Sequence, residues 1–144
     1  METGMTLKPM TALFALCLAT PVVAQDASGD PDAGESLFNR CKACHMIVDD
    51  SGEQIVRGGQ VGPNLYGLMG GPAASVEDFR YGDGIEKAAE MGLEWTEENF
   101  AAYVADPQSF LREYTGDSGV RSKMAFRLND GADDIYAYLV SVSE

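Results

Sequence analysis

The chain has 144 residues, which is enough for one ordinary domain and too few for two. Its formal net charge of −13 at pH 7 argues against a nucleic-acid-binding protein, because binding phosphates requires a surplus of lysine and arginine. Three cysteines and a single histidine leave few donors from which a metal or cofactor site could be built.

The N-terminus has the pattern of an export signal. Met10–Leu18 is almost entirely apolar, and Val22 and Ala24 are small residues at the spacing that a signal peptidase recognises. The apolar stretch is shorter than the roughly 20 residues that a membrane-spanning helix needs. We therefore predict a signal peptide at residues 1–24 that directs the chain to the periplasm, and one mature domain at residues 25–144.

Helical signals begin soon after the predicted cleavage point. Asp30 suits an N-cap, and Pro31 suits the first turn of a helix that continues into the cysteine motif described below. Residues 75–79 and 85–91 could each form a short helix. Thr96 is the cap of a better one, which should end before Asp106 and Pro107.

The C-terminal half continues in the same way. Residues 107–111 predict one further helical turn, and residues 132–142 carry an apolar stripe at helical spacing. Residues 48–71 and 116–127 read as loops, and alternating strand patterns are absent. We expect an all-α fold whose long loops are organised by a buried cofactor, because loops of this length are unusual in a compact domain.

One motif identifies that cofactor. Cys41-Lys42-Ala43-Cys44-His45 is a C-x-x-C-H sequence, the pattern of covalent haem attachment. On a helix these three side chains share one face, so both sulfurs can reach the edge of a porphyrin while the imidazole of His45 points at the iron. Three other interpretations fit less well. A structural zinc site needs four donors, and the mature chain has two cysteines and one histidine. A thioredoxin-like dithiol needs a βαβ pattern that is missing, and a structural disulfide would leave the adjacent histidine unexplained.

The second axial position of the iron decides the function. An open position would favour a gas binder or peroxidase, and a protein ligand would favour an electron carrier. No second histidine exists, so a methionine is the expected ligand. Met46 adjoins His45 and cannot reach the opposite face, Met69 closely follows a glycine-proline turn, and Met91 reads as core filler. Met124 lies in a loop and is the remaining candidate.

From Asp30 to about Val142 the sequence resembles the class I cytochromes c, and within them the longer cytochromes c2 of purple bacteria. Gly34 and Phe38 match the N-terminal helix of that family. Ile135 and Tyr138 match the C-terminal helix that crosses it. The resemblance implies the class I cytochrome c fold, a few helices and long ordered loops wrapped around one haem c.

The resemblance also assigns roles to two loop segments. Residues 62–65 are similar to the turn in which a proline carbonyl accepts the second N–H of the ligand histidine, which implies that Pro63 orients His45. Residues 122–126 are similar to the family's methionine loop and imply that Met124 is the second axial ligand.

Three aromatic residues are implied to contact the haem. Tyr103 would form a hydrogen bond near the sulfur of Met124, and Tyr81 and Trp95 would reach a haem propionate. The sequence departs from the family at Gly71, where an arginine is usual, and at Ser122, which replaces a threonine. As a hypothesis, Arg57 or Arg80 supplies the missing charge, or a propionate titrates nearer to neutral pH.

The function implied by the resemblance is electron transfer without an enzymatic reaction. The expected donor is a quinol:cytochrome c reductase, and the expected acceptor is a photosynthetic reaction centre or a terminal cytochrome oxidase. The protein is expected to be a monomer. A haem peroxidase or gas-binding sensor is the alternative. Basic residues next to the haem motif and the methionine loop would form a docking surface on an otherwise acidic body. They are Arg40, Lys42, Arg112, Arg121, Lys123 and Arg127.

Overall fold

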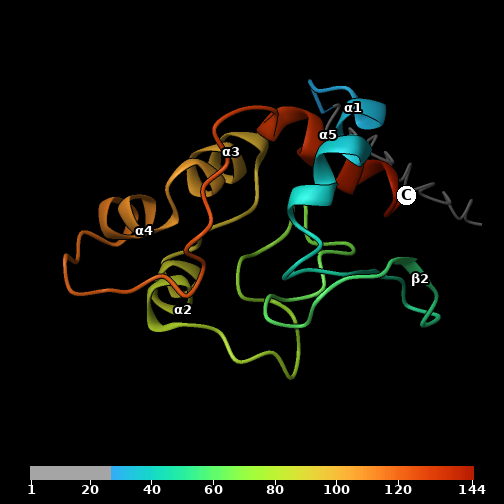
Figure 1. Ribbon diagram of the computed structural model, residues 1–144. Helices are drawn as coiled ribbons and strands as arrows, with labels where there is room; N and C mark the ends of the chain where they lie inside the picture. Colours follow the sequence, from blue (N-terminus) through green and yellow to red (C-terminus); the bar gives the residue numbers. More distant parts are fainter. Residues whose placement is uncertain (1–26) are drawn as a thin grey trace, which may run out of the picture.

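The computed structural model describes residues 27–144 (Figure 1). The predicted signal peptide, residues 1–24, lies outside the described residues. The described chain is mainly helical, with one small hairpin. In chain order its elements are α1 (Pro31–Leu37), the 3-10 helix η1 (Phe38–Arg40), β1 (Ile47–Val48), β2 (Gln54–Val56), α2 (Asp83–Glu90), α3 (Glu97–Ala105), α4 (Pro107–Thr115) and α5 (Ala132–Ser141). Between residues 27 and 144, no helix has the length and apolar character needed to cross a membrane.

Side chains before the helices fix where three of them begin. The carboxylate of Asp30 accepts a hydrogen bond from the backbone N–H of Asp32 at 2.9 Å, and the Thr96 hydroxyl accepts one from Asn99 at 3.2 Å. Asp106 caps α4 in the same way. These caps satisfy backbone donors that have no partner inside the helix. The predicted starts of α1, α3 and α4 are therefore confirmed.

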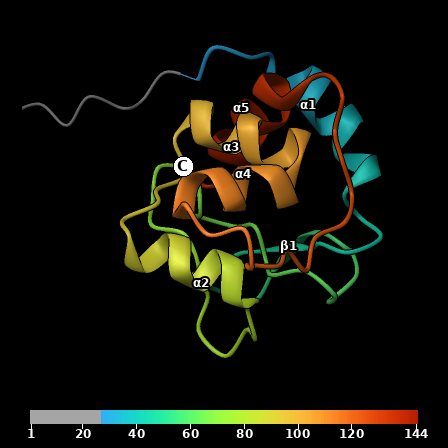
Figure 2. The same ribbon diagram turned by 90° about the vertical axis from the view of Figure 1, so that its left-hand side faces the viewer.

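The first and last helices, α1 and α5, cross in close contact (Figures 1 and 2). Gly34 is buried at the crossing, and a Cβ atom there would overlap the backbone carbonyl of Asp134. The ring of Phe38 packs against Tyr138 with centroids 5.7 Å apart. The pairing of the N- and C-terminal segments therefore depends on a glycine at position 34.

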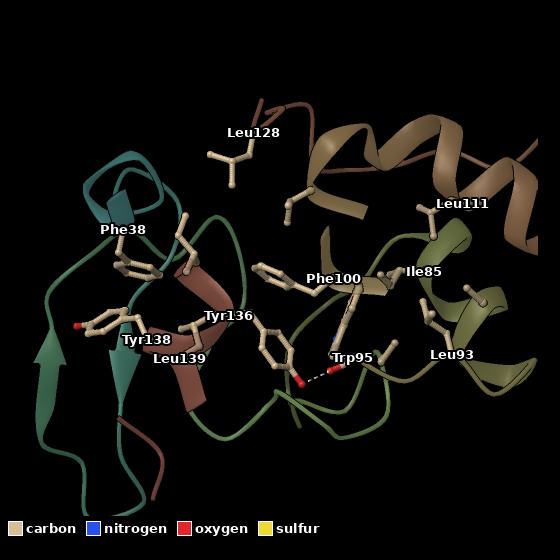
Figure 3. Packing of buried hydrophobic residues seen from close by; sticks show 14 of the residues in the cluster. Phe38, Ile85, Leu93, Trp95, Phe100, Leu111, Leu128, Tyr136, Tyr138 and Leu139 are labelled. Carbon is tan, nitrogen blue, oxygen red and sulfur yellow. Dashed lines mark hydrogen bonds between the residues drawn. The ribbon is translucent and has the colours of Figure 1, made fainter. Parts of the chain in front are cut away.

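The core continues from this crossing toward α3 (Figure 3). Phe100 packs against the ring of Tyr136, which is 2% exposed, and the Tyr136 hydroxyl donates a hydrogen bond of 3.1 Å to the carbonyl of Trp95. Trp95 stands just before α3 and is itself 8% exposed. The aromatic core thus joins α5 to the segment that leads into α3.

Several local predictions were wrong. Residues 75–79 form a turn in which Asp78 has φ +62°, a left-handed conformation that a helix cannot contain. Met91 is not core filler, because α2 ends at Glu90 and leaves the Met91 side chain 53% exposed. The extra helical turn at 107–111 is instead the full helix α4, which ends at Gly116 with φ +65°.

The hairpin formed by β1 and β2 was not predicted. Its strands have two and three residues, which is too short for an alternating pattern to show in the sequence. The carboxylate of Asp49 closes the turn by accepting hydrogen bonds from the backbone N–H groups of Ser51 and Glu53. The fold class is nevertheless as expected, with helices joined by long loops.

Candidate functional site

The helices and loops enclose a cavity of about 480 Å³ with predominantly apolar walls. Its lining comes from the cysteine motif, the loop around residue 62, helices α2 to α5 and the loop after α4. All eight residues singled out from the sequence lie on its wall: Cys41, Cys44, His45, Pro63, Tyr81, Trp95, Tyr103 and Met124.

The cysteine motif continues directly from η1 as a series of tight turns. The backbone N–H of Cys41 bonds to the carbonyl of Phe38 at 2.8 Å, and that of His45 bonds to the carbonyl of Cys41 at 2.9 Å. Cys41 and Cys44 are not joined in a disulfide bond. Burial raises the pKa of the Cys41 thiol to about 11, although the positive charge of Arg40 opposes the shift.

The imidazole of His45 is oriented by its second nitrogen. Nδ1 lies 2.8 Å from the carbonyl oxygen of Pro63, and a carbonyl can only accept, so Nδ1 carries the proton. Nε2 therefore keeps its lone pair for a metal ion. Burial lowers the pKa of His45, and the Pro63 contact only partly opposes this, so the ring is neutral at pH 7.

The loop carrying Pro63 is fastened to the segment around the cysteine motif. The backbone N–H of Gly62 bonds to the carbonyl of Cys44 at 2.8 Å, and the Asn64 side chain bonds to both backbone groups of Val48, at 2.7 and 3.0 Å. A Cβ at Gly62 would lie 2.6 Å from Nδ1 of His45 and 2.7 Å from Nε2. Only glycine leaves room for the ring at this position.

Two methionines belong to the cavity wall. Met124 lies in the loop between α4 and α5, where the Ser122 hydroxyl donates to its carbonyl at 2.9 Å. Met69 also lines the cavity, whereas Met46 and Met91 are not among the lining residues. The structure therefore brings two methionines to the cavity, including the one expected as an axial ligand.

The three aromatic candidates differ in whether their polar atoms already have hydrogen-bond partners within the protein. Burial raises the pKa of Tyr103, and the nearby side chain of Ser122 partly opposes the shift. The Tyr81 hydroxyl accepts a bond of 3.1 Å from the N–H of Val76 and can still donate. The indole N–H of Trp95 donates to no residue within the described range, although Trp95 lines the cavity. Tyr81 and Trp95 thus retain donors for an anionic group.

The structure does not bring Arg57 or Arg80 to this cavity. Arg57 lines a separate groove beside the hairpin, and Arg80 contributes its backbone carbonyl to a bond of 2.7 Å with Lys123. The cations that do line the cavity, within residues 27–144, are Arg40, Arg121 and Lys123. The hypothesis that Arg57 or Arg80 compensates the propionates therefore gains no support.

Sequence reasoning missed two apolar residues at the mouth of the cavity. Val61 is 79% exposed and Phe126 is 43% exposed, yet both line the cavity. Exposed Ala43, Cys44 and Ala125 lie on the same rim. No periodic pattern in a loop marks such residues, so only the folded structure shows them.

The donor set and the cavity fit one prosthetic group. Two thiols at the spacing of a C-x-x-C motif, a neutral imidazole and a thioether around an apolar cavity suit a covalently attached haem. Fold and site together define a haem protein of the c type.

The comparisons with known proteins give the family. No family model matches the chain. Cytochrome c-551 of Roseobacter denitrificans is 53% identical over 136 residues, covering 93% of this chain and 97% of the relative, and a cytochrome c2 of Cereibacter sphaeroides is 48% identical over 136 residues and covers 92% of each. Ferric cytochrome c-550 from Paracoccus versutus, 47% identical, superposes with a TM-score of 0.78 over 81% of this chain and 99% of that structure.

The chain therefore belongs to the class I c-type cytochromes, in the cytochrome c2 group. Members of this family carry haem c in covalent attachment and act as electron carriers, and this chain is a protein of that kind.

Proposed function

We propose that the chain is a periplasmic one-electron shuttle whose iron is closed on both sides by His45 and Met124. The observation that carries this proposal is the meeting of all eight candidate residues on one cavity wall. The donor is proposed to be a quinol:cytochrome c reductase. The acceptor is proposed to be a photosynthetic reaction centre or a terminal cytochrome oxidase, and the signal peptide at residues 1–24 would place the mature domain between them.

Each residue has a defined part in this function. Haem c supplies an iron centre that takes up and releases one electron. Cys41 and Cys44 would hold the group covalently, and the Pro63 carbonyl keeps His45 in the tautomer that can ligate iron. Tyr81 and Trp95 offer hydrogen-bond donors toward the propionates. This predominantly apolar wall would keep water away from the iron, which suits electron transfer.

A haem peroxidase or gas-binding sensor is the alternative function. Such proteins need an open axial position and a polar group beside it. His45 is the single histidine of the chain, so no second histidine can stand beside an open axial position, and the cavity wall offers the thioethers of Met69 and Met124 as ligands. The carrier is therefore the function that the geometry supports better.

Docking is proposed to use the mouth of the cavity. Val61 and Phe126 present exposed apolar side chains there, and Arg121 and Lys123 line the same cavity with exposed positive charges. Two of the six basic residues expected at this surface are neutralised instead, since Arg40 pairs with Asp130 and Arg127 pairs with Asp106. The positive field at the mouth is thus weaker than the sequence suggested.

The experiment is to follow oxidation and reduction of the purified holoprotein by membranes that contain these partner complexes. Rates should fall as salt rises, because attraction between exposed charges is screened. Lys123→Gln should slow the reaction by about threefold at low salt, and Lys87→Gln should not, although both remove one charge. Lys87 is a matched control because it also makes a single side-chain contact, with Asp117. Equal slowing by both variants, or rates independent of salt, would remove the docking proposal.

A further inference from the structure

The side chain of Gln108 bridges two backbone groups of the loop that carries Met124. Its Nε2 donates to the carbonyl of Val120 at 2.9 Å, and its Oε1 accepts from the N–H of Ser122 at 3.1 Å. A carbonyl only accepts and an N–H only donates, so both bonds require one orientation of the carboxamide. The carboxamide therefore satisfies one backbone donor and one backbone acceptor of this loop, as the backbone of a paired β-strand would.

Helix α2 packs against the same segment of the loop. A Cβ at Gly84 would lie 2.7 Å from the carbonyl oxygen of Arg121, and one at Gly82 would lie 3.1 Å from Cγ of Lys123. Residues 121–123 are thus held between the first turn of α2 and the first turn of α4, which contains Gln108.

A further contact continues from Ser122 to the ligand candidate. The Ser122 hydroxyl donates to the carbonyl of Met124 at 2.9 Å. Gln108 fixes the backbone of Ser122, and Ser122 in turn fixes the backbone of Met124. The residues from 116 to 131 form no helix or strand, so such contacts must replace regular hydrogen bonding.

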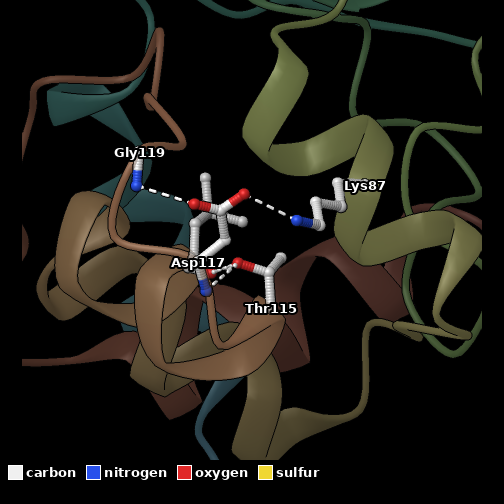
Figure 4. Close-up of polar contacts among 5 residues, drawn as sticks. Lys87, Thr115, Asp117 and Gly119 are labelled. Carbon is white, nitrogen blue, oxygen red and sulfur yellow. Dashed lines mark hydrogen bonds and ion pairs between the residues drawn. The ribbon is translucent and has the colours of Figure 1, made fainter.

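We propose that Gln108 is a positioning residue for Met124, whose carboxamide keeps the methionine loop closed and so keeps the thioether at the iron. The proposal rests on the proposed function, in which Met124 is an axial ligand. The start of the loop has a second fastening, where Asp117 pairs with Lys87 and accepts from Gly119 (Figure 4). That pair is exposed and contributes little. Gln108 is the half-buried contact next to the ligand.

The test is a titration of the ferric holoprotein with imidazole, which competes with Met124 for the iron when the loop opens. Gln108→Leu keeps a similar volume and removes both bonds, so imidazole should bind about tenfold more tightly. Gln54→Leu makes the same change in β2, outside the cavity wall. Thr96→Ala removes the cap of α3 and lowers global stability without touching the loop. Both controls should stay within about twofold of the wild type.

Each outcome decides the proposal. An affinity for Gln108→Leu within about twofold of the wild type, or an equal gain in Thr96→Ala, would overturn it. If Gln108→Leu does not fold, amide exchange in the wild type decides: protection of the Ser122 N–H supports the role, and exchange at the rate of a free amide overturns it. A wild-type ferric spectrum without the absorption band of a sulfur–iron bond would contradict the proposed function itself, which separates the two failures.

Discussion

At the scale of single residues, the ring of His45 is held on two sides by the loop that carries Pro63. The Pro63 carbonyl sets its tautomer, and Gly62 sets the distance of the loop from its face. The sequence predicted the Pro63 contact because the motif around it resembles a family turn. It did not predict the part played by Gly62, since a glycine beside a proline is equally expected in any turn.

Gly62→Ala tests this packing. The added methyl would meet the imidazole, so we expect a loss of about 1–3 kcal/mol in the free energy of unfolding and a changed haem potential. Urea unfolding and redox titration of the holoprotein measure both. Gly71→Ala is the control, because a Cβ there would meet only the Leu68 carbonyl at 3.4 Å. Identical behaviour of the two variants would show that the ring does not constrain position 62.

At the scale of elements, the structure separates what local sequence signals can predict from what they cannot. Caps and apolar stripes predicted α1, α3 and α5, because these signals act within one or two turns. The length of α4 was missed, since its C-terminus depends on the left-handed Gly116 and on the bond from Thr115 to the carbonyl of Leu111. The hairpin depends on tertiary contacts that no short pattern records.

Gly34→Ala tests the crossing of α1 and α5. Helix propensity alone would make alanine stabilising by roughly 1 kcal/mol. The buried contact with the Asp134 backbone predicts the opposite sign, a loss of about 3 kcal/mol, because backbone atoms cannot move aside easily. The midpoint of denaturant unfolding measures the effect. Ser36→Ala, exposed on the same helix, should change stability by less than about 0.5 kcal/mol. A stabilised Gly34→Ala would contradict the close crossing.

At the scale of the whole molecule, the charge distribution is the property that the sequence predicted least well. Basic residues that flank Cys41 and Met124 in sequence were expected to form one docking surface. In the fold, exposed ion pairs neutralise Arg40 and Arg127, and of the three cations that line the cavity only Arg121 and Lys123 form no such pair within residues 27–144. The sequence shows the sign of each charge. It does not show which charges pair, because the ion-pair partners come from distant segments of the chain.

Stability at alkaline pH depends on the buried tyrosines. Burial, with a smaller contribution from Glu97, raises the pKa of Tyr136 above its ordinary value of 10.0. The folded protein therefore keeps a proton that the unfolded chain releases, and the free energy of unfolding falls as pH rises above about 10. Tyr136→Phe should lower stability by about 1 kcal/mol at pH 8, through the lost bond to Trp95, and should flatten the fall above pH 10. Urea unfolding across this range measures both, and an unchanged slope would exclude Tyr136 as a cause.

The central claim is that His45 and Met124 close both axial positions of the iron in an electron carrier. The most direct measurement is carbon monoxide binding to the reduced holoprotein at neutral pH, followed by absorption, with Met124→Ala as the open-site reference. The wild type should form no carbon monoxide complex under conditions that saturate Met124→Ala. Ready binding by the wild type would contradict the claim and favour a gas-binding or peroxidase site.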